Sequence, residues 1–211
     1  MTEFTTIAAA CEQSLTEKRS EFIAQLFPVQ TAQAALAAAD AVRAKHHKAR
    51  HHVWAFRIRA GGLSRYSDDG EPQGTGGVPV LSVLEKAGLT DVCCVVTRYF
   101  GGVLLGASGL ARAYSSAAAQ AVQSAEMLHY CEAYRIRYAI DYGSYGKVSY
   151  LLPEFDTVDA GSDFGEKVTL LFDIKTNLLS ALEARLTEAF NGKPALEQLD
   201  THFVSFPKAA P

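Results

Sequence analysis

The sequence predicts an α+β protein of two domains, and two features of it support this fold class. In the first 131 residues, short apolar runs typical of strands alternate with longer amphipathic stretches typical of helices. After residue 131 the pattern restarts in the order strand, helix, strand, strand, helix, strand, which is the ferredoxin-like arrangement. A chain of 211 residues is long enough for two small domains. We therefore expect domains over residues 1–131 and 132–211.

The first domain is expected to begin with a hairpin followed by a helix. Residues 12–29 read as two strands, and Lys18 and Arg19 between them can form the turn. Thr31 is the expected N-cap of the helix, because its hydroxyl can accept a hydrogen bond from an unpaired N–H of the first turn. The apolar face of this helix ends near Lys45.

A long glycine-rich segment separates the regular elements in the middle of this domain. Residues 61–77 follow a strand over 53–59, and no strand or helix is expected within them. A loop of that length inside a compact domain is typical of a functional or a disordered segment. A helix begins near Pro79, since proline is favoured in a first turn. A buried strand over 92–96 and an alanine-rich helix over 108–125 complete the domain.

The elements of the second domain are assigned from alternation, glycine breaks and caps. Gly143 precedes the first helix, Gly165 lies in a hairpin, Asn177 is the expected cap of the second helix, and Asn191 ends it. The expected elements are a strand over 134–141, a helix ending before Pro153, a hairpin over 156–174, a helix ending at Phe190 and a strand over 195–204. Residues 207–211 are expected to fray.

Charge is divided unequally between the two domains. The net charge of −3 gives no general attraction to nucleic acid or to an anionic membrane. Residues 1–131 carry 12 Lys/Arg and 11 Asp/Glu, a net of +1, whereas residues 132–211 carry 8 and 12, a net of −4. A site for a polyanion is therefore expected in the first domain, as a local patch.

The cysteines indicate a reducing compartment. Cys11, Cys93, Cys94 and Cys131 include no Cys-x-x-Cys pair, so their spacing favours neither a zinc site nor a disulfide framework. Adjacent on a strand, Cys93 and Cys94 should point to opposite faces. The chain shows no leader pattern and no apolar run close to 18 residues. We therefore expect a cytoplasmic protein without a membrane partner.

A basic and histidine-rich cluster follows the first helix. Its cations are Arg43, Lys45, Lys48 and Arg50. They can complement the helix dipole and add solubility, or they can contact nucleic acid. The histidines at 46, 47, 51 and 52 diverge in each neighbouring pair, so we expect no metal site and no cofactor. One of His51 and His52 should pack inside with a hydrogen-bond partner, and the other should line the surface.

The end of the 92–96 strand holds the first candidate binding group. Arg98, Tyr99 and Phe100 leave this strand together and are followed by Gly101 and Gly102. Arginine with aromatic rings is a stacking and phosphate-contacting set for single-stranded nucleic acid, and equally a set favoured at protein interfaces. In a third interpretation, Arg98 forms an ion pair with an aspartate of the acidic segment described next and has a structural role.

An acidic segment supplies the second candidate group. Asp68, Asp69 and Glu71 could hold Mg²⁺ or carry out acid–base chemistry, and with His51 they define an alternative function as a metal-assisted hydrolase. Asp-Asp-Gly is also ordinary turn chemistry, and no nucleophile motif is present. The chain is therefore expected not to be an enzyme.

Four motifs between residues 49 and 106 resemble the IMPACT/YigZ family and occur in the family's order. They are Ala49-Arg-His-His, Ser67-Asp-Asp-Gly-Glu-Pro, Gly74-Thr-Gly-Gly-Val-Pro and Arg98-Tyr-Phe-Gly-Gly-Val-Leu-Leu-Gly. The resemblance implies that the first domain is similar to the second domain of a small-subunit ribosomal protein, an α/β sandwich. It implies that the second domain is similar to the C-terminal domain of elongation factor G.

The resemblance also bears on function. Eukaryotic IMPACT proteins regulate translation by competing for the activator of a starvation-sensing kinase, through a different N-terminal domain, so that role is not carried over. Bacterial members have no settled activity. We expect a non-enzymatic protein that binds RNA, the ribosome or a translation factor through residues 61–77 and 98–109. The expected binding residues are Arg50, His51, Asp68, Asp69, Glu71, Arg98, Tyr99, Gly101 and Gly102.

Overall fold

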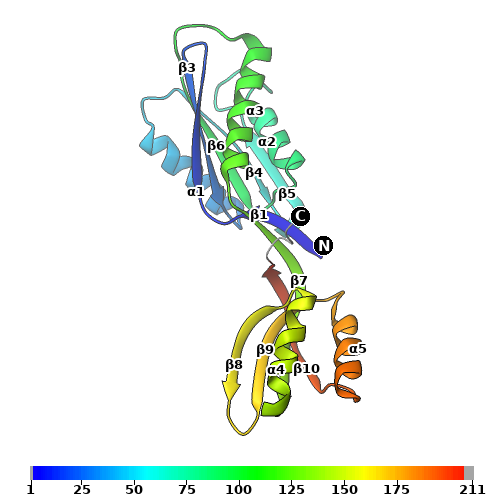
Figure 1. The fold of residues 1–211 in the computed structure, drawn as a ribbon. Coiled ribbons are helices and arrows are strands. Elements are labelled where there is room, and N and C mark those ends of the chain that lie inside the picture. Colours follow the sequence, from blue (N-terminus) through cyan, green and yellow to red (C-terminus); the bar gives the residue numbers. More distant parts are fainter. Residues whose placement is uncertain (1, 207–211) are drawn as a thin grey trace. The chain divides into compact units, whose positions relative to one another are not determined.

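In the computed structural model, which describes residues 2–206, the chain divides into two compact units (Figure 1). Residues 5–128 form the first unit, and residues 129–206 together with residues 2–4 form the second. The mixed α+β class with two domains is thereby confirmed. The strand β7 (Met127–Ile140) connects the units, and the expected boundary at residue 131 lies within it. The tail 207–211 lies outside the described residues.

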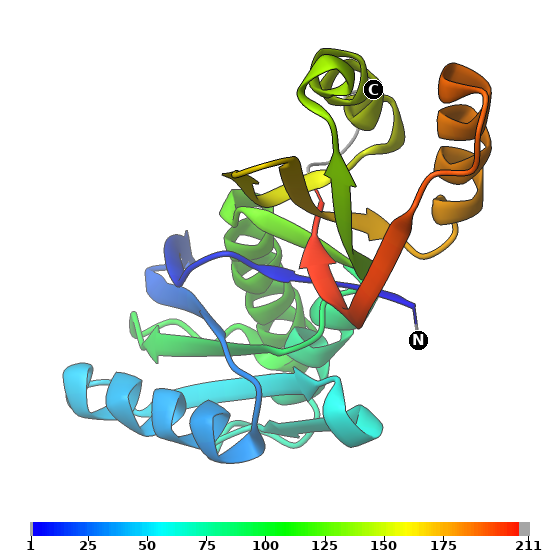
Figure 2. The ribbon, with the colours of Figure 1, turned by 90° about the horizontal axis from the view of Figure 1, so that it is seen from below.

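The first unit is a five-stranded antiparallel sheet between helices. Its strand order is β2-β3-β6-β4-β5. The strands are β2 (Cys11–Glu17), β3 (Ser20–Pro28), β4 (His51–Ile58), β5 (Leu63–Ser67) and β6 (Val92–Tyr99). The helices are α1 (Ala32–Lys45), α2 (Gly77–Lys86) and α3 (Gly106–Ser124). Figure 2 shows α1 and α3 on opposite sides of the strands. The two faces therefore form two separate cores.

The central strand β6 explains why the predicted apolar run is continuous. All its residues except Tyr99 are buried, because helices cover both faces of the sheet. Cys93 packs in the core under α1 and Cys94 in the core under α2 and α3, which confirms that they point to opposite faces. Burial raises the pKa of Cys93 to about 12 and that of Cys94 well above its ordinary value, so both stay protonated.

Local signals in the sequence account for several element boundaries. Thr31 caps α1 as predicted, since its hydroxyl accepts a hydrogen bond from the Ala34 N–H at 3.1 Å. Lys18 and Arg19 form the β2–β3 turn, both with positive φ. Asn191, in a left-handed conformation, ends the last helix.

The structure differs from the expected elements in four places. The segment 61–77 is not a single loop, because β5 forms within it as an edge strand, preceded by a short 3₁₀ turn (Ala60–Gly62). The irregular part is 68–76. The strand β6 extends through Arg98 to Tyr99. The prediction that Asn177 caps the last helix is wrong, because α5 begins after Leu178. The strand β1 (Glu3–Ile7) was not expected.

The second unit has the predicted ferredoxin-like order. After β7 come α4 (Tyr142–Leu151), a 3₁₀ turn (Leu152–Phe155), β8 (Val158–Phe164), β9 (Val168–Lys175), α5 (Leu179–Phe190) and β10 (Leu196–Ser205). The sheet is antiparallel in the order β10-β7-β9-β8, and β1 also pairs with β7. Its core lies between the sheet and the two helices. Among the described residues, no helix has the length and hydropathy needed to cross a membrane.

Candidate functional site

One end of the first unit's sheet gathers all the candidate residues. Because the strands are antiparallel, β2, β5 and β6 end where β3 and β4 begin. Four connections meet there: the turn 18–19 and the segments 46–50, 68–76 and 100–105. In Figure 1 the turn and the connection from β6 to α3 lie together at the upper end of this unit. We call these four connections, with the first turns of α3, the loop end.

Asp68 holds the start of α2. Its carboxylate accepts hydrogen bonds from three backbone N–H groups, those of Gly74 at 2.8 Å, Gly76 at 2.9 Å and Gly77 at 2.8 Å. Burial raises the pKa of Asp68, but these three bonds outweigh burial and lower it below its ordinary value. The carboxylate is therefore ionised at neutral pH and engaged by the backbone of its own loop.

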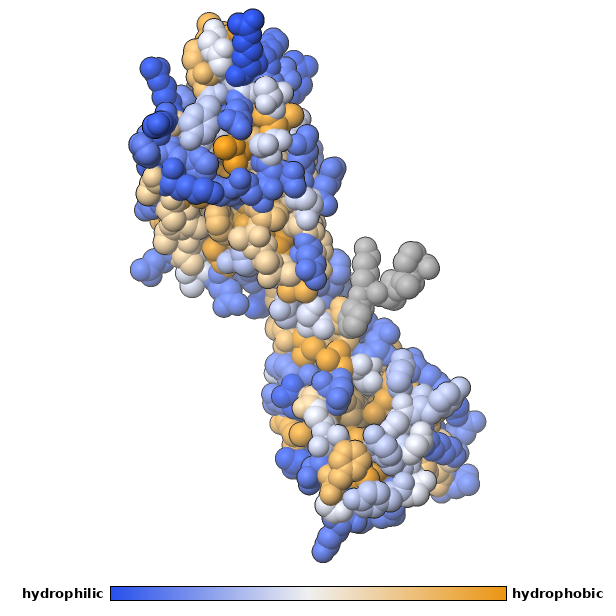
Figure 3. Space-filling view, turned by 60° about the vertical axis from the view of Figure 1, so that its left-hand side comes forward, coloured by the Kyte–Doolittle hydropathy of each residue, from blue (hydrophilic) through white to orange (hydrophobic). Residues whose placement is uncertain are grey.

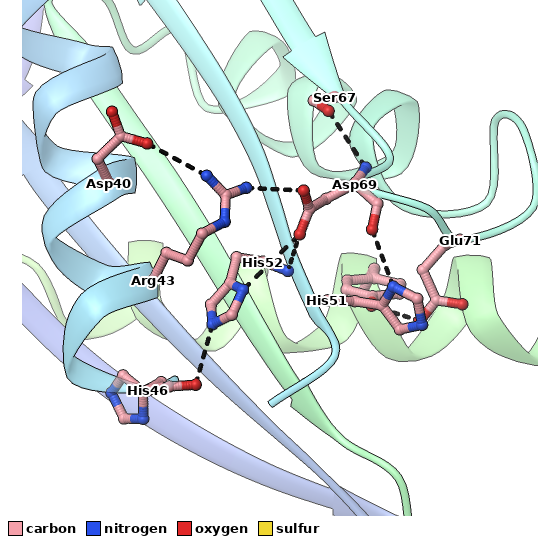
Figure 4. Close-up of polar contacts among 9 residues, drawn as sticks. Asp40, Arg43, His46, His51, His52, Ser67, Asp69 and Glu71 are labelled. Atoms are coloured by element: carbon pink, nitrogen blue, oxygen red, sulfur yellow. Dashed lines mark hydrogen bonds and ion pairs between the residues drawn. The ribbon is translucent and has the colours of Figure 1, made fainter. Parts of the chain in front are cut away.

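Asp69 connects the acidic loop to α1 and β4 (Figure 4). Its carboxylate accepts hydrogen bonds from Arg43 at 2.7 Å and from the backbone N–H of His52 at 2.6 Å. Its carbonyl oxygen lies 2.8 Å from Nδ1 of His51. Asp69 has a φ of 44°, in the left-handed region, which aspartate tolerates better than most residues other than glycine. These contacts fix the loop against the strand.

Glu71 forms a buried ion pair with Arg98. The two side chains are 3% and 7% exposed, and Nη1 of Arg98 lies 2.7 Å from Oε1 of Glu71. The Tyr114 hydroxyl donates to the same oxygen at 2.8 Å. Burial, and then the neighbouring carboxylate, raise the pKa of Tyr114, so it remains a donor. The expectation that Arg98 pairs with Asp68 or Asp69 is wrong, because both aspartates are bound elsewhere and Glu71 takes this position.

The other residues of the β6 end are also engaged within the fold. The Tyr99 hydroxyl lies 3.1 Å from Nδ1 of His46. A Cβ atom on Gly101 would lie 1.9 Å from the carbonyl oxygen of Arg19, so only glycine allows the chain to pass the β2–β3 turn so closely. Gly102 has a φ of +83°, in the left-handed region. Arg98, Tyr99 and both glycines thus have structural partners or structural reasons.

The histidine pair behaves as predicted. His52 is buried, and its Nε2 lies 3.2 Å from the carbonyl oxygen of His46, whereas His51 is half-buried. Burial lowers the pKa of His52, so it is neutral at physiological pH. Within residues 2–206, no three side chains of His, Cys, Asp or Glu are arranged to hold a metal ion. The carboxylates of residues 68, 69 and 71 contact three different sets of partners, so they do not converge on one point.

Five cations at the loop end are exposed and lack such partners. They are Lys18, Arg19, Lys48, Arg50 and Arg112. Between residues 2 and 206, none of them forms a hydrogen bond or an ion pair through its side chain. Of these, only Arg50 was among the expected binding residues. The other four could have been predicted from their positions in turns and near a helix start, because long cationic side chains at such positions stay in solvent.

Apolar side chains are exposed beside these cations. Phe100 is 51% exposed, and the Arg98 guanidinium carbon lies 5.4 Å from the centre of its ring. Leu104 is 84% exposed, in the connection between β6 and α3. Figure 3 shows hydrophobic and strongly hydrophilic residues together at the upper end of this unit. The loop end therefore combines exposed positive charge with an exposed aromatic ring.

Comparison with known proteins identifies both parts of the chain. Residues 18–122 match the Impact N-terminal domain, and residues 139–193 match a domain of unknown function, DUF1949. A crystal structure described as a hypothetical protein superposes with a TM-score of 0.61 and 29% identity, and covers 99% of each chain.

Several bacterial relatives are similar over most of the chain. IMPACT family member YvyE of Bacillus subtilis is 32% identical over 92% of this chain and 89% of its own. IMPACT family member YigZ of Escherichia coli is 33% identical over 83% and 87%. A Thermus thermophilus IMPACT family member is 41% identical over 64% and 73%. These similarities and the two domain matches establish that the chain belongs to the IMPACT family.

Proposed function

We propose that the first unit binds single-stranded RNA at the loop end, as a non-enzymatic cytoplasmic protein that acts in the regulation of translation. The observation that carries this proposal is the division of charge at the loop end. Asp68, Asp69 and Glu71 are bound within the fold, while the five exposed cations have no partner in the described structure. The exposed acids Glu17 and Glu21 at this end offset only two of the five cations, so the local charge is positive although the whole chain has a net charge of −3.

Each component of the surface has a role in this proposal. The exposed cations contact backbone phosphates, which gives affinity without sequence preference. Phe100 provides a ring on which a base can stack, and the Arg98 guanidinium behind that ring keeps it in place. Arg98 itself has no direct contact with RNA, because it is buried against Glu71. In this account the buried motif residues hold the surface in place, and the exposed residues, including Arg50 and Phe100 of the same motifs, contact the RNA.

The proposed role in translation rests on the family resemblance, and the choice of RNA as the ligand rests on the exposed cations and ring of the loop end. Ribosomal RNA is the ligand that satisfies both arguments. A protein partner such as a translation factor is the other expectation, and the exposed Phe100 and Leu104 would suit it. RNA is favoured because five cations without a partner in the described structure share the loop end with these two side chains, whereas the cores of protein interfaces are depleted of charged residues. The carboxylates that a hydrolase would need are already bound within the fold.

Fluorescence anisotropy with a short labelled single-stranded RNA tests the proposal. Wild type should bind with an affinity that falls steeply as KCl rises. Arg50→Gln should weaken binding about tenfold, and Phe100→Ala should weaken it by a similar factor through lost stacking. The matched control is Arg65→Gln, which removes an exposed cation from the middle of β5.

Two results would overturn the proposal. The first is an absence of binding to RNA at low salt. The second is an equal loss of affinity in Arg50→Gln and Arg65→Gln, which would show that net charge matters and position does not. Co-sedimentation of the same variants with ribosomes, with and without ribonuclease treatment, then separates an RNA partner from a protein partner.

A further inference from the structure

A groove of about 390 Å³ lies at the loop end, between the β2–β3 turn and one face of α3. Its walls are formed by Glu17, Lys18, Leu105, Gly109, Arg112, Ala113 and Ser116. Its volume is in the range of natural small-molecule sites. None of these residues is part of the motifs that identify the family except Leu105, which lies in the segment after Arg98. The groove is therefore a feature of the loop end that those motifs did not predict.

The side chains of the groove favour a single phosphate group. Lys18 and Arg112 enter it from two different elements, and neither has an ion-pair partner in the described residues. Glu17 is the one acidic residue among the lining residues, so the local charge suits one phosphate better than several. The first turn of α3 contains no acidic residue, so it adds no negative charge beside the groove.

The remaining lining residues leave room for a larger group beside the phosphate. Gly109 and Ala113 lie one turn apart on α3, and together with the Leu105 side chain, which lies beside Gly109, they form a low floor to the groove. Leu105 adds an apolar contact, and Ser116 adds a hydroxyl that can donate or accept a hydrogen bond. A small surface of this kind suits a flat ring, such as a nucleobase, that packs against helix backbone.

The β2–β3 turn holds its cations in a costly conformation. Lys18 and Arg19 have φ values of 45° and 67°, and a two-residue turn of this kind normally contains asparagine or glycine. The left-handed conformation costs such residues about 1–2 kcal/mol each. The turn is also held by Gly101, whose N–H donates to the Ser20 hydroxyl at 3.2 Å and whose lack of a side chain allows the close approach to Arg19. Lys18 therefore extends from a turn that is fixed in position.

We propose that this groove binds one nucleotide, with its phosphate between Lys18 and Arg112 and its sugar and base over the surface of Gly109 and Ala113. In the context of the proposed function, this nucleotide is one unit of the RNA strand. The groove then fixes the register of the strand at one point, while the other cations of the loop end contact its neighbouring phosphates. The inference rests on the proposed function for the source of the nucleotide and on the groove for its chemistry.

Titration with adenosine 5′-monophosphate and cytidine 5′-monophosphate, followed by NMR chemical shifts or by calorimetry, tests the groove directly. Both should bind wild type, and adenosine without phosphate should bind at least tenfold more weakly, since charge-assisted hydrogen bonds carry the interaction. Arg112→Gln and Lys18→Gln should each weaken the nucleotide about tenfold. Lys86→Gln, which removes an exposed lysine at the far end of α2, should have no effect.

A second variant tests the groove without changing its charge. Ser116→Phe places a large ring at an exposed position of α3 that lines the groove, so it should abolish nucleotide binding without unfolding the helix. Circular dichroism and thermal unfolding confirm that the variant is folded. Nucleotide binding that persists at wild-type strength in folded Ser116→Phe would overturn the proposal.

The result for the groove and the result for the proposed function are distinguishable. If single-stranded RNA binds equally to wild type and Arg112→Gln, and no mononucleotide binds, the groove proposal is wrong and the proposed function stands. If mononucleotides bind and Arg112→Gln weakens them, but single-stranded RNA does not bind, the groove is a site for a free nucleotide and the proposed function is wrong. If inorganic phosphate competes with the mononucleotides at similar concentration, the base and sugar have no site.

Discussion

The acidic segment 68–76 and the cations around it lie at the same end of one sheet, yet they use charge in opposite ways. The three carboxylates of the segment are all bound by the backbone or by side chains of the same unit. The cations of the β2–β3 turn, of segment 46–50 and of α3 project into solvent. This difference teaches that the carboxylates of the acidic motif hold the loop end together, while the exposed cations, Arg50 among them, are left free for a ligand.

The largest expected effect is the loss of the buried ion pair. Arg98→Met leaves the Glu71 carboxylate buried with only Tyr114 as a side-chain partner, so the free energy of unfolding should fall by about 3–5 kcal/mol. Urea denaturation measures this change. The double variant Glu71→Gln with Arg98→Met should recover part of the loss, because no unpaired charge remains. A loss below about 1 kcal/mol in Arg98→Met would contradict a structural role for the ion pair.

Substitution of the two glycines after Phe100 should destabilise the fold by different amounts. Gly101→Ala should destabilise the fold by about 3 kcal/mol, because the new Cβ atom would lie 1.9 Å from a backbone oxygen. In Gly102→Ala the new Cβ atom faces open space, so the only loss of stability comes from the φ of +83° and is about 1–2 kcal/mol. Thermal denaturation of both variants measures the difference. Equal losses would show that close packing against the β2–β3 turn is not the reason for Gly101.

The stabilisation that Asp68 provides should depend on pH. Asp68→Ala should cost about 1–2 kcal/mol at pH 7, because α2 loses the acceptor at its start. The pKa of Asp68 is lowered in the folded state, so its stabilisation is complete above the ordinary value of 3.8 and disappears as pH falls below it. The difference in unfolding free energy between wild type and Asp68→Ala should therefore shrink below pH 3.8. A difference that stays constant to lower pH would contradict this role.

The smallest expected effects separate two arginines of the same cluster. Arg43→Gln should destabilise the fold by about 1 kcal/mol, since Arg43 contacts Asp69 at 2.7 Å. Arg50→Gln should change stability by less than about 0.5 kcal/mol, because its side chain has no partner in the described structure. Urea denaturation of both variants under identical conditions checks the contrast. A clear loss in Arg50→Gln would mean that Arg50 belongs with the structural charges.

Much of the fold could be predicted from the sequence because local chemistry decides it. The Thr31 cap, the turn at Lys18 and Arg19, the Asn191 helix end and the order of the second domain depend on residues near one another in the chain. The strand β5 escaped prediction because it is an edge strand that buries little, with Tyr66 half exposed and serine at positions 64 and 67. Its pairing with β4 defines it, and no periodic apolar pattern reveals such a strand.

The meeting of the motifs was predicted, but their contacts were not. The motifs at 49–52, 67–72 and 98–101 do meet at one end of the sheet. Which acid would reach Arg98 could not be predicted, because the choice depends on where the 68–76 backbone turns. Asp68 faces the start of α2, Asp69 faces α1, and only Glu71 reaches into the space beside Tyr114. All three residues are carboxylates, so their residue types could not show which one would pair with Arg98.

The central claim is that the exposed cations of the loop end contact RNA, while Asp68, Asp69, Glu71 and Arg98 are held within the fold. The most direct test is the affinity for single-stranded RNA as a function of KCl, for wild type and for a triple variant with glutamine at positions 48, 50 and 112. Each phosphate contact to a single strand contributes about −0.7 to the slope of log K against log salt. The slope should therefore be shallower by about 2 in the triple variant. Affinity that does not depend on salt, or an equal slope in both proteins, would contradict the claim.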